Sequence, residues 1–306
     1  MAIKSYRVGE EKLNTHGDKM KIIKYNGTYD IDIEFENGFI RRCVTYTDFK
    51  RGALINVDYS KRIGEVRYNS YRSKITVMDY KDSNNVHIQF DNGYKDVVTW
   101  SSFNKGSIKS PYCKSLIGVG YVGEGEYTYD DQWYDYWSAM IERVTLKNNG
   151  FLRTYADVIM CREWYNYQVF ADWAKENYYE VQDLPMDLDK DILVKGNKVY
   201  SPETCVFTPH IINALFIKAD KSRGDLPIGV YWHERDQEYR AQCSCITDSG
   251  KRKNKWLGGY NNPIDAHLAY KKFKESHIKG MADKYKEYLP DKLYKALYEY
   301  RVDITD

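Results

Sequence analysis

The stretch from Gly229 to Phe273 constrains the fold of this 306-residue chain more than any other part of it. Between Val230 and Cys245, apolar and polar side chains alternate within two short runs, which is the period of strands with one buried face. Asp248-Ser249-Gly250 supplies the residues of a hairpin turn, and Lys251 to Leu257 gives a third short strand. This pattern predicts a small antiparallel sheet.

A helix is expected directly after this sheet. Asn262-Pro263 is typical of a helix start, and the apolar residues that follow recur at intervals of three and four, so that they form one stripe. They are Ala266, Ala269, Tyr270 and Phe273. One helix covers one face of the strands and leaves the other face free. A ribbon of two or three strands has the width to enter the major groove of DNA.

The same segment resembles a known family. The residues G-V-x-W near its start, Y-R-A-Q in the second strand and K-x-x-x-L-G-x-Y-x-x-P-x-x-A-x-x-A-Y from Lys253 to Tyr270 resemble the APETALA2-type DNA-binding domain. Versions of that domain also occur in bacterial and phage proteins, fused to HNH-type nucleases. The resemblance implies that the free face of the sheet binds double-stranded DNA.

The side chains expected at this DNA interface are mostly basic or aromatic, and would contact phosphates, sugars and guanine edges. They are Trp232, Arg235, Arg240, Gln242, Lys251, Arg252, Lys253, Lys255 and Trp256. Basic side chains on a small α+β domain also occur as an ordinary solvated face, and this alternative stays open.

Composition narrows the class of protein further. The net charge of +2 is close to neutral, so binding to nucleic acid has to come from local patches. The six cysteines are scattered without a C-x-x-C pair, which favours neither a zinc site nor a disulfide framework and fits a reducing cytoplasm. No apolar run approaches the roughly 20 residues of a membrane helix, and the first residues lack the apolar region of a signal peptide. We therefore expect a cytoplasmic protein without a membrane partner.

Residues 20–54 and 74–108 resemble each other and form an internal repeat. Each copy has an apolar strand, an alternating strand, then Asn37-Gly38 or Asn92-Gly93, a pair that accepts the positive φ of a tight hairpin. A third strand and a short F-x-x-G follow. Short strands of this number predict tandem small β-barrels of the Src-homology or Tudor type. Such barrels bind peptides, nucleic acid or other domains, and the sequence does not decide between a protein and a nucleic-acid partner.

The central block combines helical and loop patterns. A helix is expected from about Gln132 to Lys147, and a second one is indicated by the apolar residues between Tyr167 and Ala174. The segment from Pro185 to Phe216 then reads PMDLDKDILVKGNKVYSPETCVFTPHIINALF.

This segment resembles a divergent branch of the HNH nuclease family, which shows L-D-R-I-D-x-x-G-N-Y-x-P-x-N-C. The matching residues are Leu188, Asp189, Gly196, Asn197, Tyr200, Pro202 and Cys205. The resemblance implies a ββα site that holds Mg²⁺ or Mn²⁺ at Asp189 and Asn213, with Asn197 fixing the loop. The cation of such a site stabilises the leaving oxygen of a phosphodiester.

One departure from the family pattern bears on catalysis. Lys190 stands where an HNH enzyme has its general-base histidine, and an ordinary lysine with a pKa of about 10.4 is protonated at neutral pH. His210 is the nearest substitute base. Two hypotheses follow: a phage or mobile-element DNA-binding protein that acts as a nicking endonuclease, or a non-catalytic interaction protein. The second would be, for instance, a phage-encoded inhibitor that binds a host nuclease or defence protein.

Together these patterns predict an α+β multidomain protein. The expected parts are two tandem small β-barrels at residues 1–60 and 61–112, an HNH-like ββα central region at 113–222, a three-stranded sheet plus helix at 223–282 that binds DNA, and a C-terminal helix at 283–306.

Overall fold

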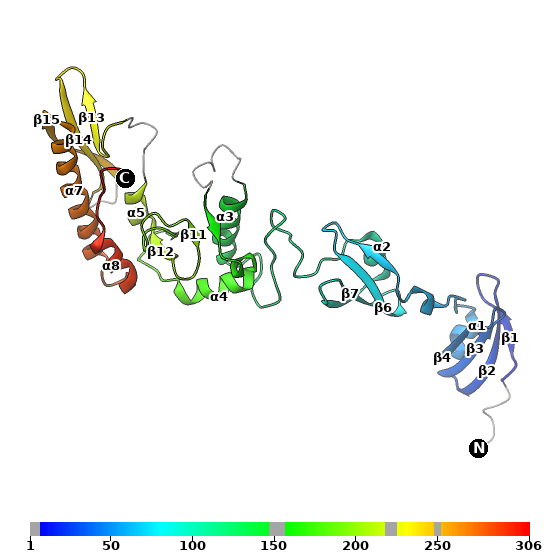
Figure 1. Cartoon of the computed structure of the whole chain (residues 1–306). Helices are drawn as coiled ribbons and strands as arrows, with labels where there is room; N and C mark the ends of the chain where they lie inside the picture. Colours follow the sequence, from blue (N-terminus) through cyan, green and yellow to red (C-terminus); the bar gives the residue numbers. More distant parts are fainter. Residues whose placement is uncertain (1–6, 147–156, 218–224, 248–251) are drawn as a thin grey trace. The chain divides into compact units, whose positions relative to one another are not determined.

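The computed structural model describes residues 7–146, 157–217, 225–247 and 252–306 (Figure 1). The chain is of mixed α+β type and divides into two compact units, residues 1–110 and 111–306. Among the described residues, no helix combines the length and the apolar character that crossing a lipid bilayer requires.

The first unit contains two antiparallel four-stranded sheets, each with its strands in sequence order. The first sheet consists of β1 (Glu11–Leu13), β2 (Lys19–Gly27), β3 (Asp30–Phe35) and β4 (Ile40–Val44), followed by α1 (Tyr46–Arg51). The second consists of β5 (Val66–Tyr68), β6 (Lys74–Asp82), β7 (Asn85–Phe90) and β8 (Lys95–Val98), preceded by the 3-10 helix η1 (Tyr59–Arg62) and followed by α2 (Trp100–Lys105).

The two copies of the repeat agree down to single hydrogen bonds. Asn14 donates from Nδ2 to the Leu54 carbonyl at 3.0 Å, and Asn69 donates in the same way to the Ile108 carbonyl at 3.0 Å. The Oδ1 atom of each asparagine also accepts two backbone N–H groups of the turn that follows it. Each copy of the repeat, with its four-stranded sheet and short helix, is called a module below. Because both asparagines are buried, these bonds fix the turn between the first two strands of each module.

The prediction of closed barrels is wrong. The edge strands of each sheet do not pair with each other, and the apolar face of each sheet is covered by a short helix instead. The F-x-x-G pattern lies in that helix: Phe49 of α1 and Phe103 of α2 are fully buried, and each following glycine ends its helix in the left-handed conformation. A helix that buries the sheet face removes the need for barrel closure.

The first part of the second unit combines short helices with two two-stranded sheets. Its elements are α3 (Trp133–Thr145), β9 (Ile159–Met160), η3 (Glu163–Tyr165), α4 (Tyr167–Asn177), β10 (Met186–Asp189), β11 (Val199–Tyr200), β12 (Val206–Pro209), α5 (His210–Asn213) and η4 (Ala214–Phe216). The strands β10 and β12 are antiparallel, whereas β9 and β11 are parallel. Trp137, Trp164 and Tyr167 are fully buried in the core that these elements share.

The C-terminal part forms the sheet and helix that the alternating pattern predicts. The sheet consists of β13 (Val230–His233), β14 (Glu238–Ile246) and β15 (Arg252–Tyr260), with β14 in the middle, and α7 (Pro263–Lys284) and α8 (Asp291–Glu299) follow. The Asn262 side chain caps α7 by accepting the N–H of Asp265 at 2.9 Å.

Helix α7 runs through residue 282, where a domain boundary is expected from the sequence, and it packs into two cores. Its first half contributes Ala266 and Tyr270 to the core of the sheet. Its second half contributes Ile278, Met281 and Ala282 to the large central core, together with α8. One helix therefore ties the C-terminal sheet to the central region.

Candidate functional site

A cleft of about 810 Å³ lies beside the hairpin of β10 and β12 and the start of α5. In the hairpin, Asp187 is opposite Thr208 and Asp189 is opposite Val206. Helix α5 begins at His210, directly after β12, so strand, strand and helix meet at one place. Of the five predicted catalytic residues, Asp189, Lys190, His210 and Asn213 line this cleft.

Asp187 connects the hairpin to α5. Its Oδ2 atom lies 2.8 Å from Nδ1 of His210 and accepts a hydrogen bond of 2.8 Å from Nδ2 of Asn213. A carboxylate at this distance fixes the orientation of the imidazole and favours a proton on Nδ1, which leaves Nε2 as a proton acceptor. Asp187 and His210 thus form a carboxylate–histidine pair at the wall of the cleft.

Asp189 organises the turn that follows β10. Its Oδ1 atom accepts the backbone N–H groups of Asp191 at 2.8 Å and Ile192 at 2.7 Å, which closes the turn after β10. Burial raises the pKa of Asp189 to about 6, and the nearby charge of Asp191 acts in the same direction. The hydrogen-bond partner of Asn213 is therefore Asp187, whereas Asp189 organises the loop.

Asn197 lies in that loop and does not line the cleft. It donates from Nδ2 to the carbonyl oxygens of Lys190 and Val199, each at 2.7 Å. These two bonds join the beginning and the end of the loop between β10 and β11, so Asn197 holds Lys190 in place.

Cations line the same cleft as the carboxylates. Lys190 is buried, and its Nζ atom lies 3.4 Å from Oδ2 of Asp191 and 5.7 Å from the centre of the Tyr200 ring. Arg143 from α3 donates to the Tyr200 hydroxyl at 3.4 Å. With Lys198, these groups offer positive charge to a phosphate that enters the cleft.

Sequence reasoning missed Asp187, although one signal pointed to it. Met186 and Leu188 are buried, and alternation along a strand places Asp187 and Asp189 together on the opposite side. The carboxylate of Asp187 and the amide of Asn213 fit Mg²⁺ or Mn²⁺, because such sites use one or two carboxylates with other oxygen donors and keep several waters.

The sheet of β13, β14 and β15 offers a second candidate surface. Ala241 and Cys243 are buried on the side of α7, and their neighbours in β14 point to the opposite side. Cross-strand pairing places Gln242 next to Trp256 and Ser244 next to Asn254. The helix-free face, as defined by this alternation, carries Tyr231, Arg240, Gln242, Ser244, Arg252, Asn254 and Trp256.

The predicted DNA-contacting residues do not all share this face, which corrects the sequence interpretation. Lys255 lies on the helix side, with its Nζ atom 4.7 Å from the centre of the Phe273 ring, and alternation places Lys253 on the same side. Trp232 also lies on the helix side, where its ring is 4.8 Å from that of Tyr239. Neighbouring residues of a strand point to opposite faces, so a run of basic residues cannot present all of its charges on one face.

The three remaining predicted DNA contacts, Arg235, Arg240 and Lys251, differ in their surroundings. Arg240 donates to Glu238 at 2.8 Å and also binds Asp236, so two carboxylates already offset its charge. Arg235 is highly exposed in the turn between β13 and β14. Lys251 lies outside the described residues.

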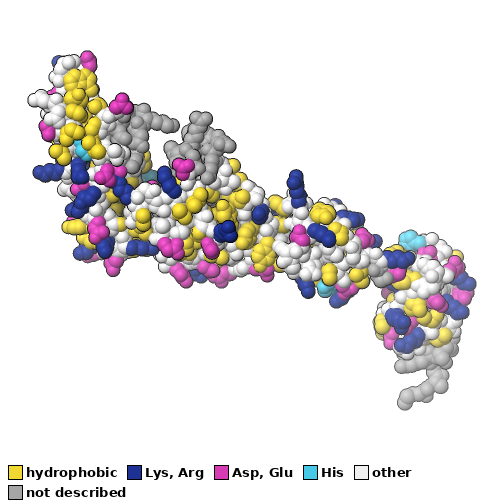
Figure 2. Space-filling view, viewed as in Figure 1, with side chains coloured by type: hydrophobic (Ala, Val, Ile, Leu, Met, Phe, Trp, Pro, Cys, Tyr) yellow, Lys and Arg dark blue, Asp and Glu magenta, His cyan; other side chains and the backbone are white. Residues whose placement is uncertain are grey.

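The charge pattern of the surface agrees with the near-neutral composition. On the face that Figure 2 draws, lysine and arginine side chains are interspersed with aspartate and glutamate. Recognition of an anionic partner therefore has to rely on particular sites.

Comparison with known proteins gave no relatives. No protein-family model matches the chain, and neither the curated proteins nor the solved structures contain a match.

Proposed function

We propose that this chain is a DNA-binding protein of phage or mobile-element type, which contacts the duplex with the helix-free face of its C-terminal sheet. The observation that carries the proposal is the set of side chains on that face. Gln242 and Asn254 lie on adjacent strands, Arg252 follows on the same face, and Trp256 is 61% exposed beside them.

These side-chain types match the groups that a duplex displays. Amides of the Gln242 and Asn254 type form paired hydrogen bonds with adenine, and guanidinium groups such as that of Arg252 do so with guanine. Exposed aromatic rings pack on sugars and bases. An antiparallel ribbon is narrow enough to bring such side chains into the major groove.

The cleft extends the proposal to HNH-like, metal-dependent nicking. Nε2 of His210 would take a proton from the attacking water, and Asp187 would stabilise the imidazolium that results. Lys190 and Arg143 would hold the phosphate by charge. Asp187 and Asn213 would hold Mg²⁺ or Mn²⁺, which supplies charge stabilisation at the leaving oxygen. This arrangement replaces Asp189 with Asp187 as the expected metal ligand.

DNA binding is tested by selection from a pool of random duplexes, followed by affinity measurements on the enriched sequence. Gln242→Ala should weaken binding by about 1–3 kcal/mol and relax the preference at one position. Lys255→Ala is the matched control, because that side chain lies against α7. Absence of enrichment from the pool would contradict the proposal.

Nicking is tested separately, with supercoiled plasmid and Mg²⁺ or Mn²⁺. Relaxed plasmid should form with the parent chain and should not form with His210→Ala, whereas Ser138→Ala, a half-buried position on α3 that does not line the cleft, should behave as the parent. Intact plasmid at high protein concentration would contradict nicking and leave DNA binding in place.

One observation favours a second candidate, a non-catalytic interaction protein such as an inhibitor of a host nuclease or defence protein. Both modules of the first unit carry the same group: Arg7 lies 4.0 Å from the centre of the Tyr46 ring, and Arg62 lies 3.9 Å from that of Trp100. A duplicated arginine–aromatic group suits a protein contact. Copurification of a nuclease, lost on Trp100→Ala together with Tyr46→Ala, would support it.

A further inference from the structure

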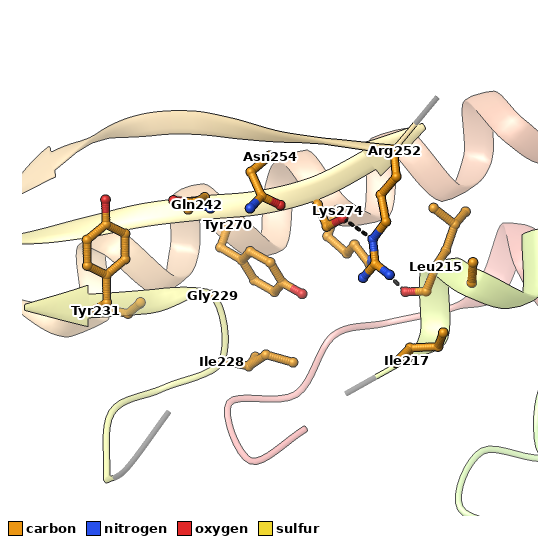
Figure 3. A pocket seen from close by; sticks show the side chains of 13 residues that line it. Leu215, Ile217, Ile228, Gly229, Tyr231, Gln242, Arg252, Asn254, Tyr270 and Lys274 are labelled. Atoms are coloured by element: carbon orange, nitrogen blue, oxygen red, sulfur yellow. Dashed lines mark hydrogen bonds between the residues drawn. The ribbon is translucent and has the colours of Figure 1, made fainter. Parts of the chain in front are cut away.

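A separate pocket of about 350 Å³ lies at the edge of β14, where β13 begins (Figure 3). Strand β13 starts at Val230, whereas β14 continues to Ile246, so part of the β14 edge has no strand beside it. The end of η4 and residues 228–231 complete the wall, and α7 contributes Tyr270 and Lys274. The pocket therefore lies within the second unit, and it shares Ile217 with the cleft at Asp187 while the other lining residues differ.

Two cations line this pocket. Lys274 is only 7% exposed, and its Nζ atom donates one hydrogen bond to the Leu215 carbonyl at 2.6 Å. Arg252 donates from Nε to the Ser244 hydroxyl at 2.7 Å. An ammonium has three N–H donors and a guanidinium has five, so donors of both groups remain for a ligand.

Neither cation has an acidic partner in the described part of the chain. No carboxylate there forms an ion pair with Arg252 or Lys274. Burial lowers the pKa of Lys274, and the charge of Arg252 contributes to that decrease. Holding two positive groups together in a half-enclosed pocket costs free energy, and an anion bound between them offsets that cost.

The rest of the lining suits a phosphate ester. Gly229 has a φ of +81°, and a Cβ atom there would lie 2.1 Å from the Tyr270 ring, so only glycine lets this ring fill its place. Figure 3 shows the Tyr270 hydroxyl pointing toward the guanidinium of Arg252. Gln242 and Asn254 add amides at the rim. The volume is at the lower end of the range for small-molecule sites, about 300–1,000 Å³, which is enough for one nucleotide.

We propose that this pocket binds a phosphate group, held by the ammonium of Lys274 and the guanidinium of Arg252. The phosphate comes either from a free nucleotide or inorganic phosphate, or from the backbone of a nucleic acid that lies on the sheet. The second source is open because Arg252 belongs both to the pocket and to the helix-free face. The site does not depend on the proposed DNA binding, because a free phosphate needs only the pocket.

The test compares two pocket variants, Lys274→Met and Arg252→Met, with two controls. Lys272→Met removes an exposed charge from the same helix, and Lys253→Met removes one from the same strand on the opposite face. Methionine keeps the unbranched apolar stem of the side chain and removes its charge. Thermal unfolding of each variant establishes that it is folded, and Arg252→Met, at an exposed position, gives an answer even where Lys274→Met does not fold.

The first arm is calorimetric titration of the full chain with inorganic phosphate and with thymidine 5′-monophosphate. Binding by the parent and both controls, weakened at least tenfold in the pocket variants, supports a free phosphate as the ligand. The second arm measures affinity for a DNA duplex as a function of salt. Loss of one phosphate contact reduces the slope of log K against log salt by about 0.9. A reduction of that size in the pocket variants alone supports a backbone phosphate.

The outcomes of the two arms are distinguishable. Phosphate binding without any DNA binding would support the pocket and contradict the proposed function. Pocket variants that match their controls in both arms would overturn the pocket, whatever the affinity for DNA.

Discussion

The Oδ2 atom of Asp187 lies 2.8 Å from Nδ1 of His210, although 23 residues separate the two in the sequence. The strand pairing that puts Asp187 opposite Thr208 and the start of α5 at His210 produce this contact. A histidine that looks like an ordinary surface residue in the sequence thereby acquires a fixed orientation beside a cleft.

Replacement of Asp187 tests this contact directly. Asp187→Asn keeps the size of the side chain and removes the charge that orients His210, so we expect plasmid nicking to fall by at least about 100-fold. The unfolding free energy should fall by only about 1 kcal/mol, because the site is partly exposed. Asp135→Asn in the same cleft is the control and should leave nicking within a few-fold of the parent.

Asp189 should make stability depend on pH. Because its folded-state pKa is raised from 3.8 to about 6, the folded protein holds this proton more tightly than the unfolded chain. The resulting stabilisation is complete below the unfolded pKa and is lost as pH rises through the folded pKa.

Asp189→Asn keeps an oxygen for the N–H groups of Asp191 and Ile192 and removes the buried charge. We expect this variant to be more stable than the parent at neutral pH by about 1–3 kcal/mol, with the difference vanishing below about pH 4. Urea unfolding at several pH values measures it. A constant difference at all pH values would contradict the assignment.

The two tryptophans of the sheet form a matched pair on opposite faces. Trp256→Ala should weaken DNA binding by about 1–3 kcal/mol and leave the melting temperature unchanged, because that ring is exposed on the helix-free face. Trp232→Ala should do the reverse, because its ring packs on Tyr239. Equal loss of DNA affinity in both variants would show that the helix-free face is not the one that binds.

The repeated asparagines predict two equal and independent losses of stability. Asn14→Ala and Asn69→Ala each remove the three hydrogen bonds that the two modules share, and Asn14 also loses its bond to Asp18, so each change should destabilise its own module by about 1–3 kcal/mol. Denaturation followed by hydrogen exchange assigns each loss to a module. The exposed Asn26, replaced by alanine, should have little effect. Destabilisation of both modules by either change would contradict independence.

Much of the architecture could be predicted from the sequence, because long periodic patterns report a buried face directly. The strands of the C-terminal sheet, the start of α7 at Asn262-Pro263 and the duplicated strands of the first unit all follow from such patterns. Helices α1 and α2 could not be found this way, because six residues are too few to show a helical period. Missing them led to the wrong prediction of closed barrels.

The candidate site was predicted less completely than the fold. The positions of His210 and Asn213 after the hairpin predict their place in the site, but the contact with Asp187 depends on strand register, which no local pattern determines. The division of the basic residues is different, because alternation alone separates Arg252 from Lys253 and Lys255. The division of the basic residues between the two faces of the sheet could therefore be predicted from the sequence.

The number of residues in α7 between its two core contacts determines the angle between the C-terminal sheet and the cleft. Each residue of an α-helix turns the chain by about 100° and advances it by about 1.5 Å. Since Tyr270 is fixed in one core and Ile278 in the other, the eight-residue step between them sets the rotation of the sheet about the helix axis. The orientation of a duplex bound to the sheet, relative to the cleft, would depend on this rotation. Adding or deleting one residue between Tyr270 and Ile278 would therefore change that orientation without altering either surface.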